Sequence, residues 1–255
     1  MKLLLLFFSV ICYSQNNCDK IFNGCDKPCG PVEKREERII LNEDQNKVSP
    51  YSYVIHQTFN RIFGNFSSTS SFIAPDVLIT AHHNVIRQGM IKGITLYNPA
   101  NNNQNMYLKK KEFIIYTYKS KLNPLTDIAI IKFKNPNKIK AYYFGHFQLD
   151  KVDNIKTKTS EVHLTGFPCD MTNTKIDKKC TINDLYLDDK MSLIGYNMFT
   201  CTGDSGAPLW LIDNDKPTII GIHHGGNEGY INNCFNISAK MDTDFLKWIN
   251  QYIAK

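Results

Sequence analysis

Short apolar segments, separated by glycine, proline, asparagine or serine, recur along most of this chain of 255 residues. Many short strands at such spacing are typical of an all-β barrel or sandwich. With 42% hydrophobic residues, a chain of this length can bury a substantial core. The clearest segments are Phe72–Ala74, Val77–Ile79, Phe113–Ile115, Ile128–Ile131, Val162–Leu164 and Ile219–Ile220.

The C-terminal segment has a different pattern. Asp242 and Thr243 offer N-caps, and the apolar residues that follow recur at helical spacing. These residues are Phe245, Leu246, Trp248, Ile249, Tyr252 and Ile253. The pattern predicts a helix over Thr243–Ile253.

Residues 202–208 read Thr-Gly-Asp-Ser-Gly-Ala-Pro and place Ser205 between small neighbours. Such neighbours let a substrate chain come close, and they let the amides of Gly203 and Ser205 point at one spot, as an oxyanion hole requires. Gly-x-Ser-x-Gly also marks a hydrolase fold in which the serine lies between a strand and a helix. The flanking segments here are typical of strands. Taken alone, the segment could also be a glycine-rich turn with a surface serine.

Two upstream segments complete a pattern. A strand-like run over 77–85 includes His82 and His83, and Asp127 enters a second such run. A histidine at a strand end is often structural, and an aspartate before a strand is often a turn residue. The chain order His, Asp, Ser is nevertheless the order of the chymotrypsin-like proteases and differs from that of other serine hydrolases.

From Ile39 to its C-terminus the chain resembles the chymotrypsin-like serine proteases. The segments around Asp127 and Ser205 carry this resemblance, and Ile219–Gly226 is similar to the bacterial glutamyl endopeptidases. The resemblance implies an all-β fold of two antiparallel six-stranded β-barrels, with the active site in the seam and the C-terminal helix on the second barrel. We expect the seam near residues 145–160. We expect no cofactor and no metal.

The catalytic roles follow from the residue types and from the family's Thr-x-x-His pattern. In this pattern the catalytic histidine stands three residues after a threonine. Thr80 therefore favours His83 as the base, and His82 would pack beneath the site. His83 would take the Ser205 proton and return it to the leaving amine, while Asp127 would fix the imidazole tautomer. With an oxyanion hole formed by the Gly203 and Ser205 amides, the predicted reaction is peptide hydrolysis through an acyl-enzyme.

Substrate preference depends on three positions. Phe199 stands six residues before Ser205, where trypsin-like enzymes carry an aspartate, so preference for Lys or Arg is not expected. Thr200 and His223 match the positions through which glutamyl endopeptidases bind a carboxylate, and both can donate hydrogen bonds. The prediction is cleavage after Glu and, less well, after Asp. His223 could also be structural, and His224 is either a second donor or solvent-facing.

Two rival functions stay open. One is a family protease with a non-acidic preference, in a pocket floored by Phe199. The other is a non-catalytic, protease-like binding protein, although His83, Asp127 and Ser205 are all present.

The N-terminal residues indicate that the chain is cleaved after synthesis. Residues 1–14 read as a signal peptide, since the apolar run 3–12 is too short to span a bilayer. We therefore expect a secreted protein, or one in a vesicular lumen. Residues 15–38 read as a propeptide before a protease domain at 39–255, with cleavage after Arg38 giving a new terminus at Ile39. An uncut, charged linker is the alternative.

The role of the Ile39 amine is open. In chymotrypsin-like zymogens this amine pairs with the acid before the catalytic serine, which here is Asp204. In the glutamyl endopeptidases that acid is typically absent, and the amine lies near the acidic side chain of the substrate.

Cysteine usage favours an oxidising destination. Of eight cysteines, Cys12 falls in the signal segment. The resemblance implies a Cys201–Cys234 disulfide beside the pocket, and Cys169–Cys180 is expected to close a local loop. Cys18, Cys25 and Cys29 precede the protease domain. Two of these three could pair, and zinc binding by the three would lack an evident fourth ligand.

The net charge of +6 is spread along the chain and modestly favours acidic substrates. Because the lysines are interspersed with acids and no aromatic-basic motif is present, nucleic-acid binding is not expected. The expected partners are protein or peptide substrates, with no membrane association, and the expected state is a monomer.

Overall fold

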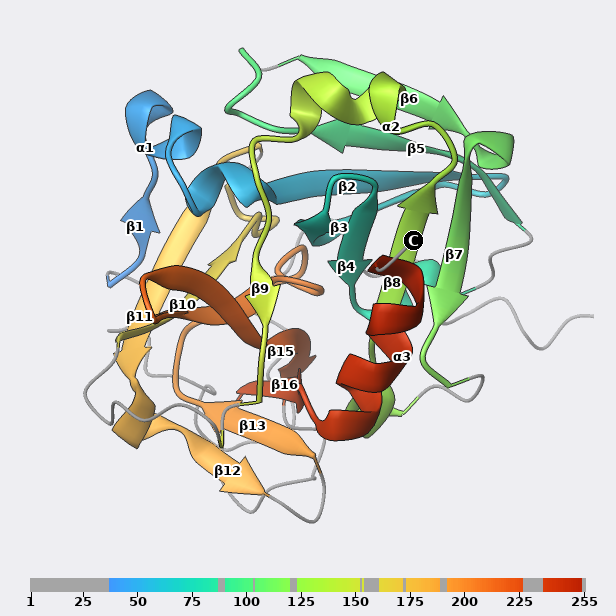
Figure 1. Ribbon diagram of the computed structural model, residues 1–255. Helices are drawn as coiled ribbons and strands as arrows, with labels where there is room; N and C mark the ends of the chain where they lie inside the picture. The colour runs from blue at the N-terminus through green and yellow to red at the C-terminus, as the bar shows by residue number, and fades with distance from the viewer. Residues whose placement is uncertain are drawn as a thin grey trace, which may run out of the picture.

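The computed structural model describes residues 37–86, 90–102, 104–119, 123–151, 153, 161–171, 173–188, 192–226 and 236–253. Within these ranges the chain forms two curled antiparallel sheets with a few short helices (Figure 1). The predicted signal peptide and all but the last two residues of the predicted propeptide lie outside the described residues.

The first sheet has seven strands in the order β6-β5-β2-β3-β4-β8-β7. Its strands are β2 (Val54–Arg61), β3 (Asn65–Ala74), β4 (Val77–Thr80), β5 (Ile91–Tyr97), β6 (Asn105–Lys109), β7 (Phe113–Thr117) and β8 (Ala129–Phe133). Both central strands β4 and β8 are almost entirely buried, as their continuous apolar runs predicted.

The second sheet has nine strands in the order β1-β11-β10-β14-β15-β16-β13-β12, with β9 pairing parallel to β15 off this path. Its strands are β1 (Ile39–Ile40), β9 (Gln148–Leu149), β10 (Glu161–Gly166), β11 (Ile176–Thr181), β12 (Tyr186–Asp188), β13 (Leu193–Tyr196), β14 (Pro208–Asp213), β15 (Lys216–Gly226) and β16 (Asn236–Lys240).

These sheets confirm the two-part all-β fold, while the strand numbers differ from the expected six in each half. The second sheet would have six strands without β1, β9 and β12, which are only two or three residues long. Strands this short carry too few apolar residues to stand out in a sequence.

Helices occupy little of the described chain. The short helices α1 (Glu43–Lys47) and α2 (Pro136–Ile139) precede and follow the first sheet, and α3 (Thr243–Ile253) ends the described chain. The predicted C-terminal helix is confirmed with the same bounds. Phe245 and Ile249 of α3 are fully buried in the largest core cluster, which includes residues from both sheets.

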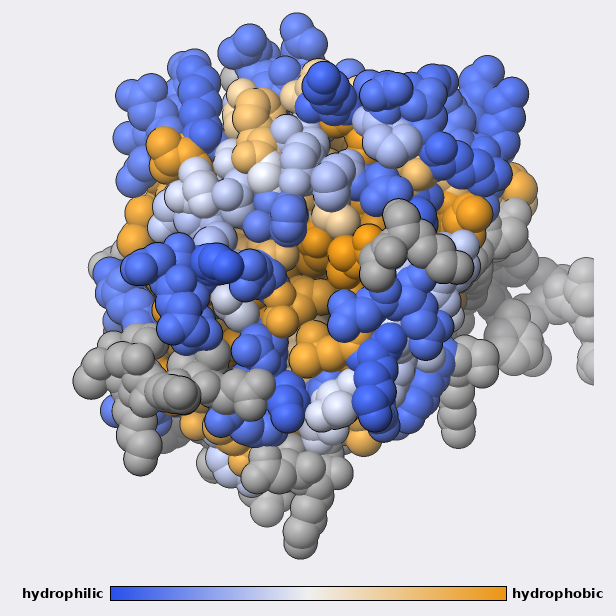
Figure 2. Space-filling view, in the orientation of Figure 1, coloured by the Kyte–Doolittle hydropathy of each residue, from blue (hydrophilic) through white to orange (hydrophobic). Residues whose placement is uncertain are grey.

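The chain passes from the first sheet to the second between the end of β8 and the start of β9. The expected seam at residues 145–160 overlaps the end of this crossing, although residues 154–160 lie outside the described part. On the face shown in Figure 2, apolar surface gathers between β9 and α3 and is surrounded by hydrophilic residues. Within the described residues, no helix has the length and apolarity that a membrane crossing needs.

Candidate active site

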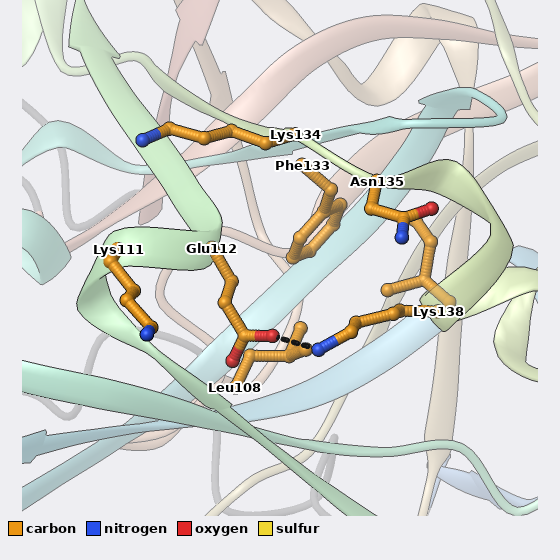
Figure 3. A pocket seen from close by; sticks show the side chains of 8 residues that line it. Leu108, Lys111, Glu112, Phe133, Lys134, Asn135 and Lys138 are labelled. Atoms are coloured by element: carbon orange, nitrogen blue, oxygen red, sulfur yellow. Dashed lines mark hydrogen bonds and ion pairs between the residues drawn. The ribbon is translucent and has the colours of Figure 1, made fainter.

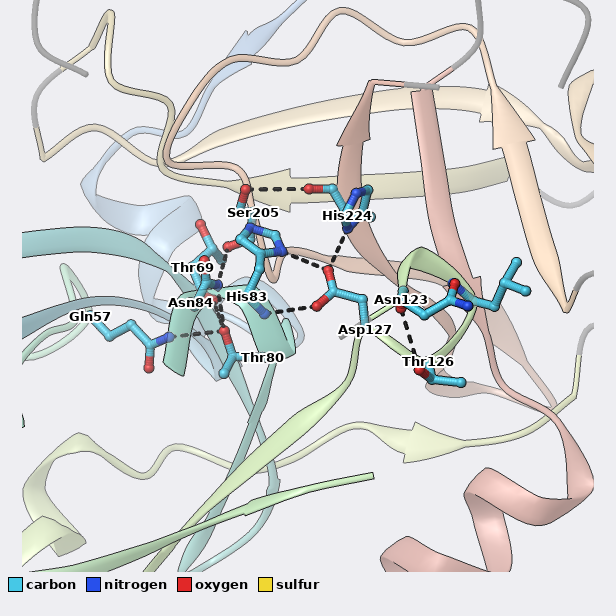
Figure 4. A network of polar contacts seen from close by, with 11 residues as sticks. Gln57, Thr69, Thr80, His83, Asn84, Asn123, Thr126, Asp127, Ser205 and His224 are labelled. Atoms are coloured by element: carbon cyan, nitrogen blue, oxygen red, sulfur yellow. Dashed lines mark hydrogen bonds and ion pairs between the residues drawn. The ribbon is translucent and has the colours of Figure 1, made fainter. Parts of the chain in front are cut away.

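Four segments from the two halves of the fold bring the predicted site residues together (Figure 4). His83 lies in a 3₁₀ turn over His82–Val85 that directly follows β4. Asp127 follows a second 3₁₀ turn, which Asn123 caps by accepting a hydrogen bond from Leu125 N at 2.9 Å. Ser205 lies in the turn before β14. The fourth segment is the end of β15.

His83 and Asp127 make a two-point contact. The main-chain N of His83 donates to Asp127 Oδ1 at 2.8 Å, and its Nδ1 lies 2.6 Å from Asp127 Oδ2. The aspartate side chain is fully buried, whereas that of His83 keeps 20% of its surface exposed. This contact fixes the Nδ1–H tautomer and leaves Nε2 of His83 able to accept a proton.

His224 has a contact that the sequence did not indicate, since it was expected either to donate to the substrate or to face solvent. Its Nδ1 lies 2.5 Å from Asp127 Oδ2, so one carboxylate oxygen accepts hydrogen bonds from two imidazoles. The His224 side chain is 10% exposed, and its ring stands edge-on to that of His83 at a centroid distance of 5.2 Å. His224 therefore supports the aspartate instead of facing solvent. Two adjacent histidines at the end of a strand were the only signal in the sequence.

Two opposing effects act on the Asp127 carboxyl. Burial raises its pKa, but hydrogen bonds from His224 and His83 outweigh burial and hold the pKa well below its usual value. The carboxylate is therefore ionised over the whole physiological pH range, which lets it stabilise an imidazolium on His83.

Contacts from the first sheet hold the turn that carries Ser205. The Ser205 carbonyl accepts hydrogen bonds from Thr69 N and from Asn84 Nδ2, both at 3.0 Å. Asn84 follows His83 in the chain, so one short turn positions both the predicted base and the predicted nucleophile. The Ser205 hydroxyl donates to the His224 carbonyl oxygen at 3.4 Å, so the predicted proton transfer to His83 would require this hydroxyl to turn.

The predicted oxyanion donors lie in the same turn. Gly203 has φ +98°, a backbone conformation that favours glycine, and its carbonyl accepts a hydrogen bond from Thr69 Oγ1 at 2.8 Å. Neither the Gly203 nor the Ser205 amide donates a hydrogen bond to the described part of the chain. Among the described residues, both amides are thus open to a ligand.

His82 occupies a different environment from its neighbour. It is 7% exposed, and its Nδ1 makes no hydrogen bond within the described residues. Burial lowers the pKa of this imidazole. His82 is thus a packed side chain, and of these two neighbouring histidines His83 is the one that hydrogen-bonds to the aspartate.

The predicted pocket residues Phe199 and Thr200 are buried, at 7% and 6% exposure. Thr200 Oγ1 donates to Asn236 Oδ1 at 2.9 Å, which uses the hydroxyl proton that a substrate carboxylate would need. The Arg38 guanidinium carbon lies 5.2 Å from the centroid of the Phe199 ring. A cation therefore stacks on the residue expected at the floor of the pocket.

His223 is 1% exposed, and its Nδ1 lies 2.5 Å from the hydroxyl of Tyr196, which in turn contacts Ser238 Oγ at 3.0 Å. Burial, assisted by the Lys178 ammonium, holds the pKa of His223 well below its usual value. The imidazole is therefore neutral in the free protein, and the charge-assisted hydrogen bond expected from a protonated His223 is not available before substrate binds. A neutral ring whose Nδ1 accepts from Tyr196 still offers Nε2–H as a donor.

The two predicted disulfides have different outcomes. Cys234 lies outside the described residues, so the Cys201–Cys234 pairing stays a prediction. No bond joins Cys169 to Cys180 in this structure. The β10–β11 register places Cys180 opposite Val162, far along the hairpin from the loop that holds Cys169. The structure therefore does not support the expected disulfide between Cys169 and Cys180.

Among the described residues, one group could hold a metal ion. The ligand atoms of His83, Asp127 and His224 all lie within 4.8 Å of one another. Hydrogen bonds among the three already use these atoms, as expected for residues that move protons.

A separate cavity of about 270 Å³ lies in the first half of the fold (Figure 3). Lysines rim an apolar floor there, and Lys138 pairs with Glu112. The lining residues are Leu108, Lys111, Glu112, Phe133, Lys134, Asn135, Lys138 and Ile139. None of the predicted site residues lines this cavity.

Comparison with known proteins gives a consistent result. A family model described as Trypsin matches residues 42–249. A solved structure described as a Glu endopeptidase in complex with MPD is similar in fold, with a TM-score of 0.65 and 20% identity over 86% of this chain and 97% of that one. The protease Anisep from Arthrobacter nicotinovorans gives a TM-score of 0.61 and 14% identity over 82% of this chain and 99% of that one. No curated protein matches the sequence.

Proposed function

Because the chain belongs to the trypsin family of serine proteases, we propose that His83, Asp127 and Ser205 carry out its peptide hydrolysis and that it prefers glutamate before the scissile bond. The observation that carries the catalytic assignment is the contact of His83 with a fully buried Asp127 carboxylate through both ring and main chain. Members of this family are serine endopeptidases, so the reaction is peptide-bond hydrolysis.

The proposed mechanism follows from this geometry. Ser205 Oγ attacks the scissile carbonyl carbon while His83 Nε2 takes its proton, and Asp127 stabilises the imidazolium that forms. The amides of Gly203 and Ser205 donate to the tetrahedral oxyanion. His83 then protonates the leaving amine. Water, deprotonated by the same imidazole, hydrolyses the acyl-enzyme and restores Ser205.

The proposed preference for glutamate is supported by the polar groups around the expected pocket. His223 can donate through Nε2, and an incoming carboxylate would favour its protonated form by raising its pKa. Thr200 would have to turn its hydroxyl away from Asn236 to contribute. Phe199 offers no acid to a basic side chain. A structurally similar protein is described as a Glu endopeptidase, although its low identity makes that likeness one of fold.

A panel of matched peptides tests both parts of the proposal. The peptides differ only in the residue before the scissile bond, which is Glu, Asp, Gln, Phe or Lys. We expect kcat/KM to be highest for Glu, lower for Asp, and at least tenfold lower for Gln. Ser205→Ala should lower turnover by roughly 10⁴-fold or more, as triad replacements do elsewhere.

The outcomes separate the specificity from the chemistry. Equal rates for Glu and Gln, or a preference for Phe, would keep the serine protease and discard the carboxylate pocket. A Ser205→Ala variant with near-full activity would contradict the nucleophile assignment.

Secretion and removal of residues 1–14 are part of the same proposal. They rest on the apolar N-terminal segment. N-terminal sequencing of protein exported from the producing cell would identify the first residue, and retention of Met1 in exported protein would contradict the signal peptide.

A further inference from the structure

Lys178 forms a buried ion pair with Asp204, the residue before the proposed nucleophile. The Lys178 Nζ lies 2.5 Å from Asp204 Oδ2, and the two side chains are 4% and 0% exposed. The same carboxylate oxygen accepts a hydrogen bond from Cys201 N at 3.0 Å. A carboxylate this deeply buried requires a paired cation, and Lys178 supplies one.

This ion pair is attached to the turn that forms the catalytic site. The Asp204 N donates to the Cys201 carbonyl at 3.0 Å, and the Asp204 carbonyl accepts from Ala207 N at 2.8 Å. Between these contacts lie both proposed oxyanion donors, Gly203 and Ser205. Fixing the Asp204 side chain therefore fixes the direction in which those two amides point.

The strand that carries Lys178 also pairs with the segment expected to supply a new amino terminus. In β1, Ile39 lies opposite Asp177 of β11, and Ile39 is 36% exposed. The Ile39 nitrogen is part of an intact peptide bond to Arg38. In this uncleaved chain Lys178 already pairs with Asp204, the acid that a free amine holds in chymotrypsin-like zymogens.

Arg38 is itself packed in the folded chain. Its Nη1 lies 3.1 and 2.8 Å from the two Asp170 carboxylate oxygens, and both side chains are 11% exposed. Its guanidinium also stacks on Phe199. A trypsin-like protease would have to pull this side chain out of its contacts in order to cut after it.

We propose that Lys178 replaces a cleavage-generated amino terminus, so that its ammonium holds the Asp204 carboxylate and the protease is active with the Arg38–Ile39 bond intact. The inference rests on the proposed function of this site and adds how the site is activated. Lys178 is a positioning residue in this account, because it acts through Asp204 and not on the substrate.

The first test compares two forms of the wild-type protein on the best peptide of the panel. One form is the exported chain with the Arg38–Ile39 bond intact, verified by mass spectrometry before and after the assay. The other is the same protein cut at that bond. We expect the intact form to hydrolyse the peptide with a kcat/KM within about threefold of the cut form.

The second test replaces the lysine. Lys178→Met should lower kcat by about 10²–10³-fold, the loss seen when one oxyanion donor is removed, with a much smaller change in KM. Lys178→Arg keeps the charge and should recover part of kcat. The neighbouring Lys179→Met removes an exposed pair with Glu161 and should stay within twofold of wild type.

A further variant keeps the test decisive if Lys178→Met does not fold. Lys178→Met with Asp204→Asn leaves no unpaired buried charge, and we expect this double variant to fold and to remain slow. Full activity in the double variant would overturn the role of the ion pair.

The outcomes also distinguish this inference from the proposed function. An intact chain that is inactive and gains activity on cleavage after Arg38 would overturn the role of Lys178 while keeping the protease. If neither form hydrolyses any peptide or reacts with a serine-directed phosphonate, the proposed function fails and the inference fails with it.

Discussion

Removing Lys178 from its buried pair with Asp204 should lower the stability of the protein by a large, measurable amount. Lys178→Met leaves a fully buried carboxylate whose remaining hydrogen bond comes from Cys201 N. The second carboxylate oxygen, Oδ1, already has no hydrogen-bond partner within the described residues. The substitution therefore lowers the free energy of unfolding by the cost of burying a charge that has no counter-ion.

The size of this effect follows from burial. Breaking a buried pair by removing one partner costs about 3–5 kcal/mol. For a domain of this size each kcal/mol lowers Tm by about 2–4 °C, so we expect Tm to fall by about 6–20 °C. The matched control is Lys179→Met, whose pair with Glu161 has side chains 46% and 54% exposed. Exposed pairs contribute about 0–1 kcal/mol.

Urea unfolding followed by circular dichroism, on wild type and both variants, measures these differences. Adding Asp204→Asn to Lys178→Met should recover at least half of the lost free energy of unfolding, because the neutral amide no longer needs a cation. If Lys178→Met is no more destabilising than Lys179→Met, the carboxylate is not isolated from solvent and the reasoning about the pair is wrong.

Three further predictions concern other parts of the molecule. His224→Phe removes a donor from Asp127, the proposed catalytic aspartate. It should lower the free energy of unfolding by up to about 3 kcal/mol and raise the activation free energy for kcat by up to a similar amount. His224→Asn keeps an N–H donor and should lose less in steady-state kinetics and urea unfolding. Burial lowers the pKa of His56 to about 4. Between pH 6.5 and 4 the unfolded chain therefore binds more protons than the folded one, so stability should fall by up to about 3 kcal/mol as the pH drops. His56→Phe should show a smaller fall in urea titrations at pH 7 and 4.5, and an equal fall would exclude His56 as the cause. Gly166→Ala would place a Cβ 2.4 Å from Asp204 Oδ1, and should destabilise by about 1–3 kcal/mol and slow peptide hydrolysis, whereas Gly226→Ala, with open space around it, should do neither.

The features that sequence predicted well depend on local pattern. Buried runs such as Val77–Ile79 and Ile128–Ile131 are central strands, and the helical spacing after Asp242 gives α3. Of the neighbours His82 and His83, the ring of His83 contacts the aspartate, as the Thr-x-x-His pattern indicated, and its role as the base stays a prediction. Each of these predictions uses residues close together in the chain, where periodicity and motif spacing carry the information.

The features that sequence missed depend on contacts between distant segments. Lys178 reaches Asp204 because the register of β11 turns its side chain inward. Lys179 is the same residue type at the next position, so the sequence alone does not indicate which of the two lysines is buried. The partner of His224 lies 97 positions away in the chain. His223 is neutral because it is fully buried, which a motif match to a carboxylate-binding position does not reveal.

Covalent labelling tests whether Ser205 is a nucleophile activated by His83. The intact protein is treated with a serine-directed phosphonate, and the modified residue is located by peptide mass spectrometry. We expect one adduct, on Ser205, which forms in wild type and is lost in His83→Ala. Absence of an adduct in folded wild-type protein, or an adduct on Ser205 that forms equally fast in His83→Ala, would contradict it.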